Sequence, residues 1–236
     1  MTSTEHIKPQ PKAKKKLSLR TKILIVILAV ILLVGATVAF AYSRYVYPTG
    51  RIIPGLYAVR THRNGMPMGN FFLMQAGEKY IAIDAGADNT ETGNALQQLG
   101  ISANDVIVVF ITHSDWDHIG SLDLFGNAAI YTGNTESSEF PDIPHNIMAD
   151  GEVIEIYGLS VQCIYTPGHT SDSVCFLING KYLFVGDLFI NPNLARYDRE
   201  SQTLYQEKML GLEGVEYIFT GHFGLFKSVR LFRWWF

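Results

Sequence analysis

Two histidines and two aspartates stand within six residues of the segment ITHSDWDHIG, residues 111–120. Imidazole nitrogens and carboxylate oxygens are common protein ligands of Zn²⁺ and related cations. Side chains two residues apart in an extended segment point to the same face, so we expect His113 and Asp115 to converge on one cation. Asp117 and His118, on the turn that follows, are expected to reach a second. The segment therefore predicts a metal site.

Three more candidate ligands follow, each beside a glycine at the end of an apolar run. They are His169 in TPGHT, Asp187 in VGDLF and His222 in TGHFG. A single loop histidine or aspartate is usually a helix cap or a solvated residue. Together with the segment above, however, these residues predict one shared metal cavity. The remaining histidines are expected at the surface: His6, His62 and His145.

The apolar runs that precede these residues are typical of buried strands. Asn179-Gly180 is typical of a type I′ turn between antiparallel strands, Gly100 of a helix end, and residues 133–151 of an irregular loop. Strand runs interrupted by a few helices favour an α/β fold, with packed sheets and helices outside. Strands are expected over residues 55–61, 70–75, 79–84, 106–112, 128–132, 152–157, 159–165, 173–178, 181–186 and 215–221, and helices over 89–100, 119–125 and 201–210.

The N-terminal part has a different composition. Residues 1–22 hold seven basic residues and one glutamate, and residues 23–42 contain no charge. About twenty apolar residues are enough to cross a hydrocarbon core as a helix, and the positive-inside rule keeps the basic side in the cytoplasm. We expect a cytoplasmic tail over 1–22, a signal-anchor over 23–42, a linker over 43–50 and one extracytoplasmic domain over 51–236.

A cleaved signal peptide is the alternative interpretation of this segment, because Ala39 and Ala41 form an A-x-A-like cleavage site. The apolar character continues through Val38 and Phe40, beyond an ordinary signal-peptide core, which favours the anchor. A buried core helix is disfavoured because the segment has no polar face.

The charge balance bears on the partners. The whole chain carries 19 basic and 22 acidic residues, and beyond residue 22 the balance is 12 against 21. Nucleic-acid binding relies on basic surface. We therefore expect a small-molecule substrate, no nucleic acid, and a lipid bilayer as the partner of the N-terminal helix.

The series IDAG, THSDWDH, TPGHT, GD and TGH resembles the metallo-β-lactamase superfamily of hydrolases over nearly the whole of residues 51–236. The resemblance implies an αββα sandwich with a cleft for two metal ions at one edge of the sheets. It also implies that Asp84 of IDAG supports the ligand loop without binding metal. In this resemblance the first metal is held by His113, Asp115 and His169, the second by Asp117, His118 and His222, and both by Asp187.

One position departs from the family pattern, because Asp115 stands where the usual motif has histidine. A carboxylate still binds Zn²⁺. With Asp115, Asp117, Asp187 and a hydroxide, however, a cluster of two divalent cations is formally neutral, where the usual pattern leaves one positive charge. Oxygen ligands also shift the preference toward harder metals. Two Zn²⁺ ions are the expected cofactors, with Mn²⁺ or Fe²⁺ as alternatives.

The resemblance implies a hydrolase in which a metal-bound hydroxide attacks a small ester, thioester, lactone or amide. Asp117 is expected to accept a hydrogen bond from the nucleophile and aim it. The rival interpretations are an exported nuclease or phosphodiesterase, a di-iron redox enzyme, and a non-catalytic metal-binding module. Arg196 and Tyr197 are expected either to bind an anionic substrate group or, as favoured here, to lie in a solvated loop.

Cys163 and Cys175 flank His169 on strands expected to be neighbours. In an exported domain a disulfide is an alternative, but two buried thiols are favoured.

The C-terminal segment has apolar residues at three- and four-residue steps, which predicts one face of a helix. A terminal helix packed on the domain is favoured over a segment at the membrane interface. The residues of this face are Phe226, Val229, Phe232, Trp235 and Phe236.

Overall fold

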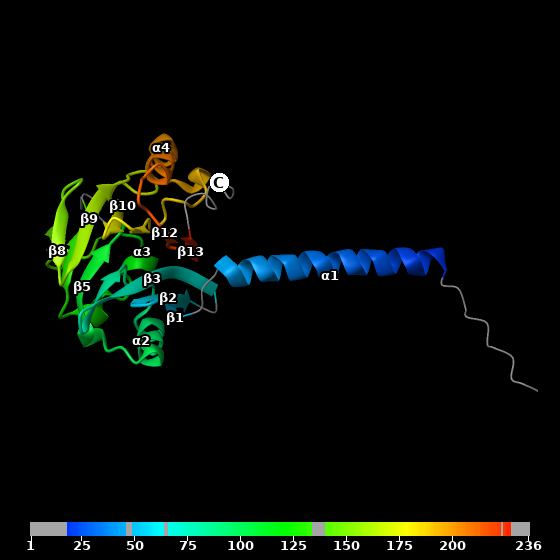
Figure 1. The fold of residues 1–236 in the computed structure, drawn as a ribbon, viewed down its shortest axis with the longest axis horizontal. Helices are drawn as coiled ribbons and strands as arrows, with labels where there is room; N and C mark the ends of the chain where they lie inside the picture. Colours follow the sequence, from blue (N-terminus) through cyan, green and yellow to red (C-terminus); the bar gives the residue numbers. More distant parts are fainter. Residues whose placement is uncertain (1–17, 46–48, 64–65, 134–139, 223, 228–236) are drawn as a thin grey trace, which may run out of the picture. The chain divides into compact units, whose positions relative to one another are not determined.

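The computed structural model describes residues 18–45, 49–63, 66–133, 140–222 and 224–227 (Figure 1). The chain divides into two compact units, Met1–Ser43 and Arg44–Phe236, and each is described by itself.

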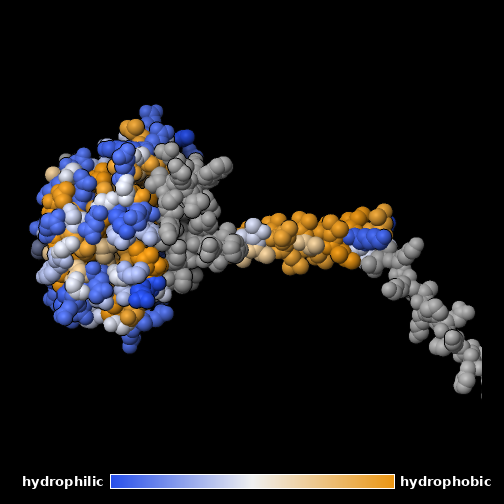
Figure 2. Space-filling view, viewed as in Figure 1, coloured by the Kyte–Doolittle hydropathy of each residue, from blue (hydrophilic) through white to orange (hydrophobic). Residues whose placement is uncertain are grey.

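One long helix, α1 (Leu19–Tyr45), forms the described N-terminal segment. Its stretch Leu19–Ala39 is long and apolar enough to cross a membrane, and none of that stretch is buried; a signal sequence passes the same test. Figure 2 shows apolar side chains along most of the helix. The helix starts earlier than predicted because Ser18 caps it, its Oγ accepting a hydrogen bond from the Thr21 N–H at 3.2 Å.

Residues 43–50, the expected linker, overlap the end of α1 and the start of the first strand. α1 continues to Tyr45, and the first strand already begins at Gly50.

Two sheets form the second unit. The first has the strand order β1-β2-β3-β4-β5-β6-β7 and the second β13-β12-β11-β10-β9-β8. The bounds are β1 Gly50–Ile53, β2 Leu56–Arg63, β3 Met66–Ala76, β4 Lys79–Ile83, β5 Val106–Ile111, β6 Ala129–Thr132, β7 Asn146–Ile147, β8 Val153–Ile156, β9 Leu159–Tyr165, β10 Val174–Ile178, β11 Tyr182–Phe184, β12 Tyr217–Thr220 and β13 Gly224–Lys227.

The main core lies between the two sheets. Alternate residues of a strand point to opposite faces, and β3 follows this rule, with Phe72 facing the second sheet and Phe71 facing outward. The Phe72 ring lies 5.4 Å from that of Phe184 in the second sheet, and the Phe110 ring lies 5.1 Å from that of Phe176. These aromatic pairs join the sheets face to face.

Helices cover both outer faces, and Figure 1 shows α2 (Asn89–Leu99) and α4 (Arg199–Leu210) on opposite sides of the sheets. Leu96 of α2 packs on the outer face of the first sheet, and Met209 of α4 packs on that of the second. This is the predicted αββα sandwich. Gly100 ends α2 at a φ of 69°, as predicted.

The predicted hairpin turn is confirmed. Asn179 and Gly180, between the antiparallel strands β10 and β11, both have positive φ angles of 54° and 64°. A type I′ turn requires that combination.

The prediction of one helix over residues 119–125 is wrong. The structure has a short α-helix, α3 (Trp116–Ile119), and a 3-10 turn, η2 (Leu122–Phe125). Gly120 separates them and packs so tightly that a Cβ there would lie 2.5 Å from the Ala87 carbonyl oxygen. This close packing and the bridge from Ile119 to Gly86 override local helix propensity.

An irregular loop is expected over residues 133–151. The described part of this range contains one short strand, β7. The predicted C-terminal helical face is wrong at Phe226, which lies in β13 and pairs with Ile218 of β12. Backbone pairing with an available sheet edge prevails there over the three- and four-residue pattern. The rest of that predicted face, in residues 228–236, lies outside the described residues.

Candidate metal centre

The predicted ligands lie where strands end. Asp84 follows β4, His113 follows β5, Asp187 follows β11 and His222 follows β12. β4 and β5 run parallel in one sheet, and β11 and β12 run parallel in the other. Their carboxyl ends therefore bring these side chains to one edge of the sandwich, and the loop between β9 and β10 adds His169.

A first cluster comprises four residues whose ligand atoms all lie within 4.8 Å of one another: His113, Asp115, His169 and Asp187. Asp115 Oδ2 lies 3.0 Å from His169 Nε2 and 3.5 Å from His113 Nε2. Asp115 occupies the N-cap position of α3 but makes no capping hydrogen bond. Its carboxylate is thus directed into the cluster.

A second cluster meets the same 4.8 Å criterion and comprises Asp117, His118 and His222. His222 Nε2 lies 3.6 Å from Asp117 Oδ2. The Gly69 N–H donates a hydrogen bond to that same oxygen at 3.1 Å, which fixes the Asp117 carboxylate.

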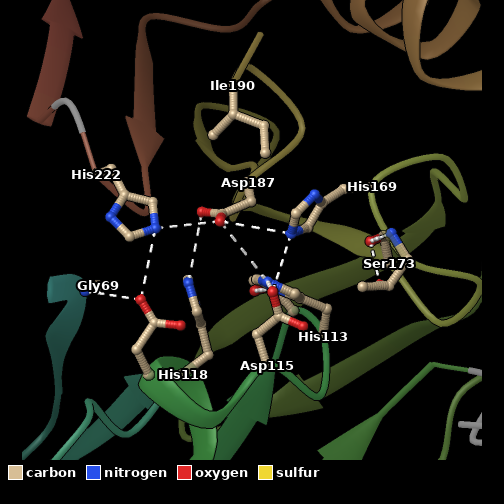
Figure 3. Close-up of polar contacts among 12 residues, drawn as sticks. Gly69, His113, Asp115, His118, His169, Ser173, Asp187, Ile190 and His222 are labelled. Carbon is tan, nitrogen blue, oxygen red and sulfur yellow. Dashed lines mark hydrogen bonds and ion pairs between the residues drawn. The ribbon is translucent and has the colours of Figure 1, made fainter. Parts of the chain in front are cut away.

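Asp187 lies between the two clusters, as Figure 3 shows. Its Oδ2 is 3.7 Å from His169 Nε2 and 3.1 Å from His222 Nε2. Its Oδ1 is 3.4 Å from His118 Nε2. One carboxylate therefore reaches imidazoles of both clusters, so it is placed to bridge two cations.

Several buried atoms of these clusters fit a divalent cation. His113 Nε2, His118 Nε2 and Asp187 Oδ1 are buried and have no hydrogen-bond partner among the described residues. Buried polar atoms ordinarily have partners, and imidazole nitrogen and carboxylate oxygen are suitable ligands for Zn²⁺, Mn²⁺ and Fe²⁺. The donor set is therefore one that two divalent metal ions would satisfy.

Asp84 belongs to neither cluster but forms hydrogen bonds that support both. Its Oδ1 accepts a hydrogen bond from the Thr112 N–H at 2.8 Å, directly before His113 in the chain. Its Oδ2 lies 2.8 Å from His118 Nδ1. Asp84 thereby holds one residue from each cluster in place.

The family model described as the metallo-beta-lactamase superfamily matches residues 65–222, a range that includes every candidate ligand. This chain belongs to the metallo-beta-lactamase superfamily. Among curated relatives, an atrochrysone carboxyl ACP thioesterase of Aspergillus fumigatus is 22% identical over 171 residues, 68% of this chain and 52% of that protein. The chain spans about half the length of the curated relatives it matches.

Solved structures share the fold. A metallo-beta-lactamase family protein from Thermus thermophilus has a TM-score of 0.63 and 20% identity, with 77% of each chain covered. A flavo di-iron protein variant from Thermotoga maritima has a TM-score of 0.64 and 19% identity, with 78% of this chain and 58% of that chain covered. At these identities the likeness shows the metallo-beta-lactamase fold.

The electrostatics of this superfamily member favour the metal-binding protonation states of His113, His169 and Asp187. Burial, followed by the neighbouring His118, lowers the pKa of His113 to about 3. Burial also lowers the pKa of His169. Burial would lower the pKa of His118 too, but the Asp84 and Asp187 carboxylates raise it well above its ordinary value. Burial would raise the pKa of Asp187, but His118 holds it well below its usual range. Two carboxylates around one imidazole create a demand for positive charge that a divalent cation meets.

A further supporting residue was not singled out in the sequence. Asp172, in the loop that carries His169, accepts a hydrogen bond from the Ser114 N–H at 2.9 Å. Ser114 lies between His113 and Asp115, so Asp172 connects two ligand-bearing loops. Its short spacing from His169 is the only sequence signal for this role.

The outer side of the first cluster carries a basic residue and a cavity. The Arg196 guanidinium pairs with Asp115 Oδ1, and the Arg196 side chain is 49% exposed. Tyr197 is exposed as well. Both residues therefore lie in a solvated loop, as favoured, and Arg196 additionally contacts a candidate ligand. A cavity of about 640 Å³ reaches Arg196 and is otherwise lined by Ser114, Trp116, Ile119, Gly120, Leu122, Asp123, Pro141 and Ile143. Its wall is mainly apolar, and two of its residues, Ser114 and Trp116, flank Asp115 in the chain.

Proposed function

We propose that this chain is a membrane-anchored, extracytoplasmic metallo-hydrolase acting on a small ester, thioester, lactone or amide. The observation that carries this proposal is the position of Asp187 between two clusters of imidazole and carboxylate ligands. The family and the thioesterase relative support hydrolysis of an acyl compound.

We assign seven residues as ligands of two divalent cations, with zinc expected and manganese or iron as alternatives. Asp187 would contact both cations, and the other residues would divide between the first and second site: His113, Asp115 and His169, then Asp117, His118 and His222. When bound, such cations supply Lewis acidity toward a carbonyl and lower the pKa of a water molecule.

Asp117 is the residue we assign to orient the attacking water. The Gly69 N–H holds its Oδ2, so the carboxylate has a fixed direction and can accept a hydrogen bond from water. The cavity beside Asp115 has the size of a small-molecule pocket. Its apolar wall, which includes Trp116 and Ile143, suits the acyl side of a substrate.

The experiment uses the full chain purified in detergent and loaded separately with zinc, manganese or iron(II). Hydrolysis of chromogenic ester, thioester, lactone, β-lactam and phosphodiester substrates is measured together with metal content. Asp187→Asn is the matched inactive variant, and Asp198→Asn, which keeps the α4 cap, is the control. Two bound metals without turnover of any acyl substrate would contradict the hydrolase assignment, and turnover of the phosphodiester alone would favour a phosphodiesterase.

The anchor is tested separately. The apolar stretch Leu19–Ala39 and the basic residues before it support a single span with the second unit outside the cytoplasm. Protease added to intact expressing cells should digest the second unit, and the chain should keep its N-terminal tag. Loss of the tag with release of the second unit would instead indicate a cleaved signal peptide.

A di-iron redox enzyme is the second candidate. The likeness in fold to a flavo di-iron protein and the three carboxylates among the candidate ligands favour it. Protein that takes up iron in preference to zinc and consumes oxygen with an electron donor would support this alternative.

A further inference from the structure

The two carboxylate oxygens of Asp115 face different groups. Oδ2 lies 3.0 Å from His169 Nε2 and 3.5 Å from His113 Nε2, inside the first cluster. Oδ1 pairs with Nη2 of Arg196 outside it. The Asp115 side chain is 12% exposed and that of Arg196 is 49% exposed. Asp115 therefore lies at the boundary between the cluster and solvent, with one oxygen on each side.

The backbone of Arg196 is held by the loop that carries a candidate ligand. The Arg196 N–H donates to the His169 carbonyl oxygen at 2.9 Å, and the Asp198 N–H donates to that of Gly168 at 3.0 Å. Asp198 in turn caps α4. A Cβ on Gly168 would lie 2.6 Å from the Cα of Gln202, so α4 packs directly on this loop. The position of Arg196 is thus built into the scaffold of the first cluster.

Charge supplies a second reason for the pairing. Three carboxylates, Asp115, Asp117 and Asp187, face two divalent cations where the usual family motif would present two. One guanidinium next to Asp115 offsets the additional negative charge. Because the Arg196 side chain is half exposed, water screens most of its charge. Its larger effect is therefore to hold the Asp115 carboxylate in position, and its effect on the total charge of the cluster is smaller.

We propose that Arg196 is a positioning residue that locks Asp115 as a single-oxygen ligand, so that the pair takes the place of a neutral histidine at the first metal site. The proposal rests on the metal-binding role proposed above for Asp115. It also means that Arg196 serves the metal centre and is not a substrate anchor.

The test is a double-mutant cycle read as zinc affinity on the full chain in detergent, by competition with a chelator. Arg196→Gln should weaken the first zinc about 10- to 100-fold, the cost of removing a partner that orients a ligand. In the Asp115→His background the same substitution should change zinc affinity by less than about threefold, because the carboxylate that needs fixing is gone. Arg196→Lys should recover part of the loss, since an ammonium can pair with Oδ1 but lacks the planar fork.

Two controls separate positioning from general damage. Arg199→Gln removes an exposed charge from the first turn of α4 and should leave zinc affinity unchanged. With cobalt(II) in the first site, the visible spectrum of Arg196→Gln should differ from that of the natural chain. In the Asp115→His background, adding Arg196→Gln should leave the cobalt spectrum unchanged.

The outcomes distinguish this proposal from the proposed function. Equal losses in both backgrounds, or no loss in the natural one, would overturn the role of Arg196 while two tightly bound zinc ions would still support the metal centre. A natural chain that binds none of zinc, cobalt, manganese and iron(II) would overturn both.

Discussion

Asp84 Oδ2 and His118 Nδ1 lie 2.8 Å apart inside the protein, with residue exposures of 2% and 0%. The carboxylate accepts a hydrogen bond from the ring, which directs the other ring nitrogen, Nε2, toward Asp187. The same carboxylate accepts two hydrogen bonds from Thr112, one from its N–H and one from its hydroxyl. Asp84 itself has a φ of 64°, in the left-handed region that aspartate and asparagine tolerate best.

Asp84→Asn should weaken metal binding while preserving the fold. Asparagine keeps the backbone conformation, but its amide has one acceptor oxygen for three donors, so one of them faces an NH₂ group. We expect zinc affinity at the second site to fall about 10- to 100-fold. Competition with a chelator measures this zinc affinity. Asp88→Asn, at the N-cap of α2, is the control, because asparagine caps equally well. Unchanged affinity in Asp84→Asn would mean that the ring needs no carboxylate to orient it.

Asp187→Asn should remove about one metal per chain and reduce hydrolysis by several orders of magnitude. Only this carboxylate among the described residues approaches imidazoles of both clusters, at 3.7 Å for His169 and 3.1 Å for His222. Its loss leaves each cation one ligand short. Elemental analysis and turnover are measured on the same preparation. Retention of two metals and near-normal turnover would show that Asp187 is not the bridge.

The residues proposed as metal ligands could be singled out from the sequence because each lies directly after an apolar strand or in a compact motif. Local spacing carries that information. The contacts that support these residues could not be predicted from the sequence, because they join residues far apart in the chain. Gly69 and Asp117 are 48 positions apart, and Arg196 and Asp115 are 81 positions apart. Their geometry depends on how loops pack once both sheets have formed.

The layered arrangement was equally accessible, since a continuous apolar run such as that of β5 indicates a strand buried on both faces. Two local predictions failed for tertiary reasons. Gly120 packs against the Ala87 carbonyl and ends α3 early, and Phe226 joins the edge of β12 as a strand. The spacing of apolar residues in a short segment cannot show whether a sheet edge is available for that segment to pair with.

Cys163 and Cys175 should remain thiols and react only after unfolding. Both are buried and free, and although they lie on adjacent strands, Cys163 faces the core between the sheets while Cys175 faces the layer under α4. Burial raises the pKa of each thiol to about 12, so both stay protonated at pH 8 and are poor nucleophiles. A chromogenic thiol reagent should count none in the native chain and two in denaturant, without added reductant. A count of none in denaturant would indicate a disulfide.

Gly69→Ala should disturb the second metal site selectively. A Cβ at this position would lie 2.9 Å from the Asp117 carbonyl oxygen and 3.2 Å from His118 Nε2, the nitrogen that faces the cluster. The methyl group would therefore press on one ligand and on the backbone of another, and it would disturb the hydrogen bond from the Gly69 N–H to Asp117. We expect bound zinc to fall from about two to about one per chain under limiting metal, because the first cluster does not contact this residue.

The matched control is Gly93→Ala, in the middle of α2, where a new Cβ meets no atom within 4 Å. Reduced freedom of the unfolded chain should raise the free energy of unfolding by about 0.4–1 kcal/mol, with zinc content unchanged. Thermal unfolding of the metal-free proteins and elemental analysis of the loaded ones provide both readouts. If Gly69→Ala binds two zinc ions as tightly as the natural chain, the close approach of β3 does not shape the second site.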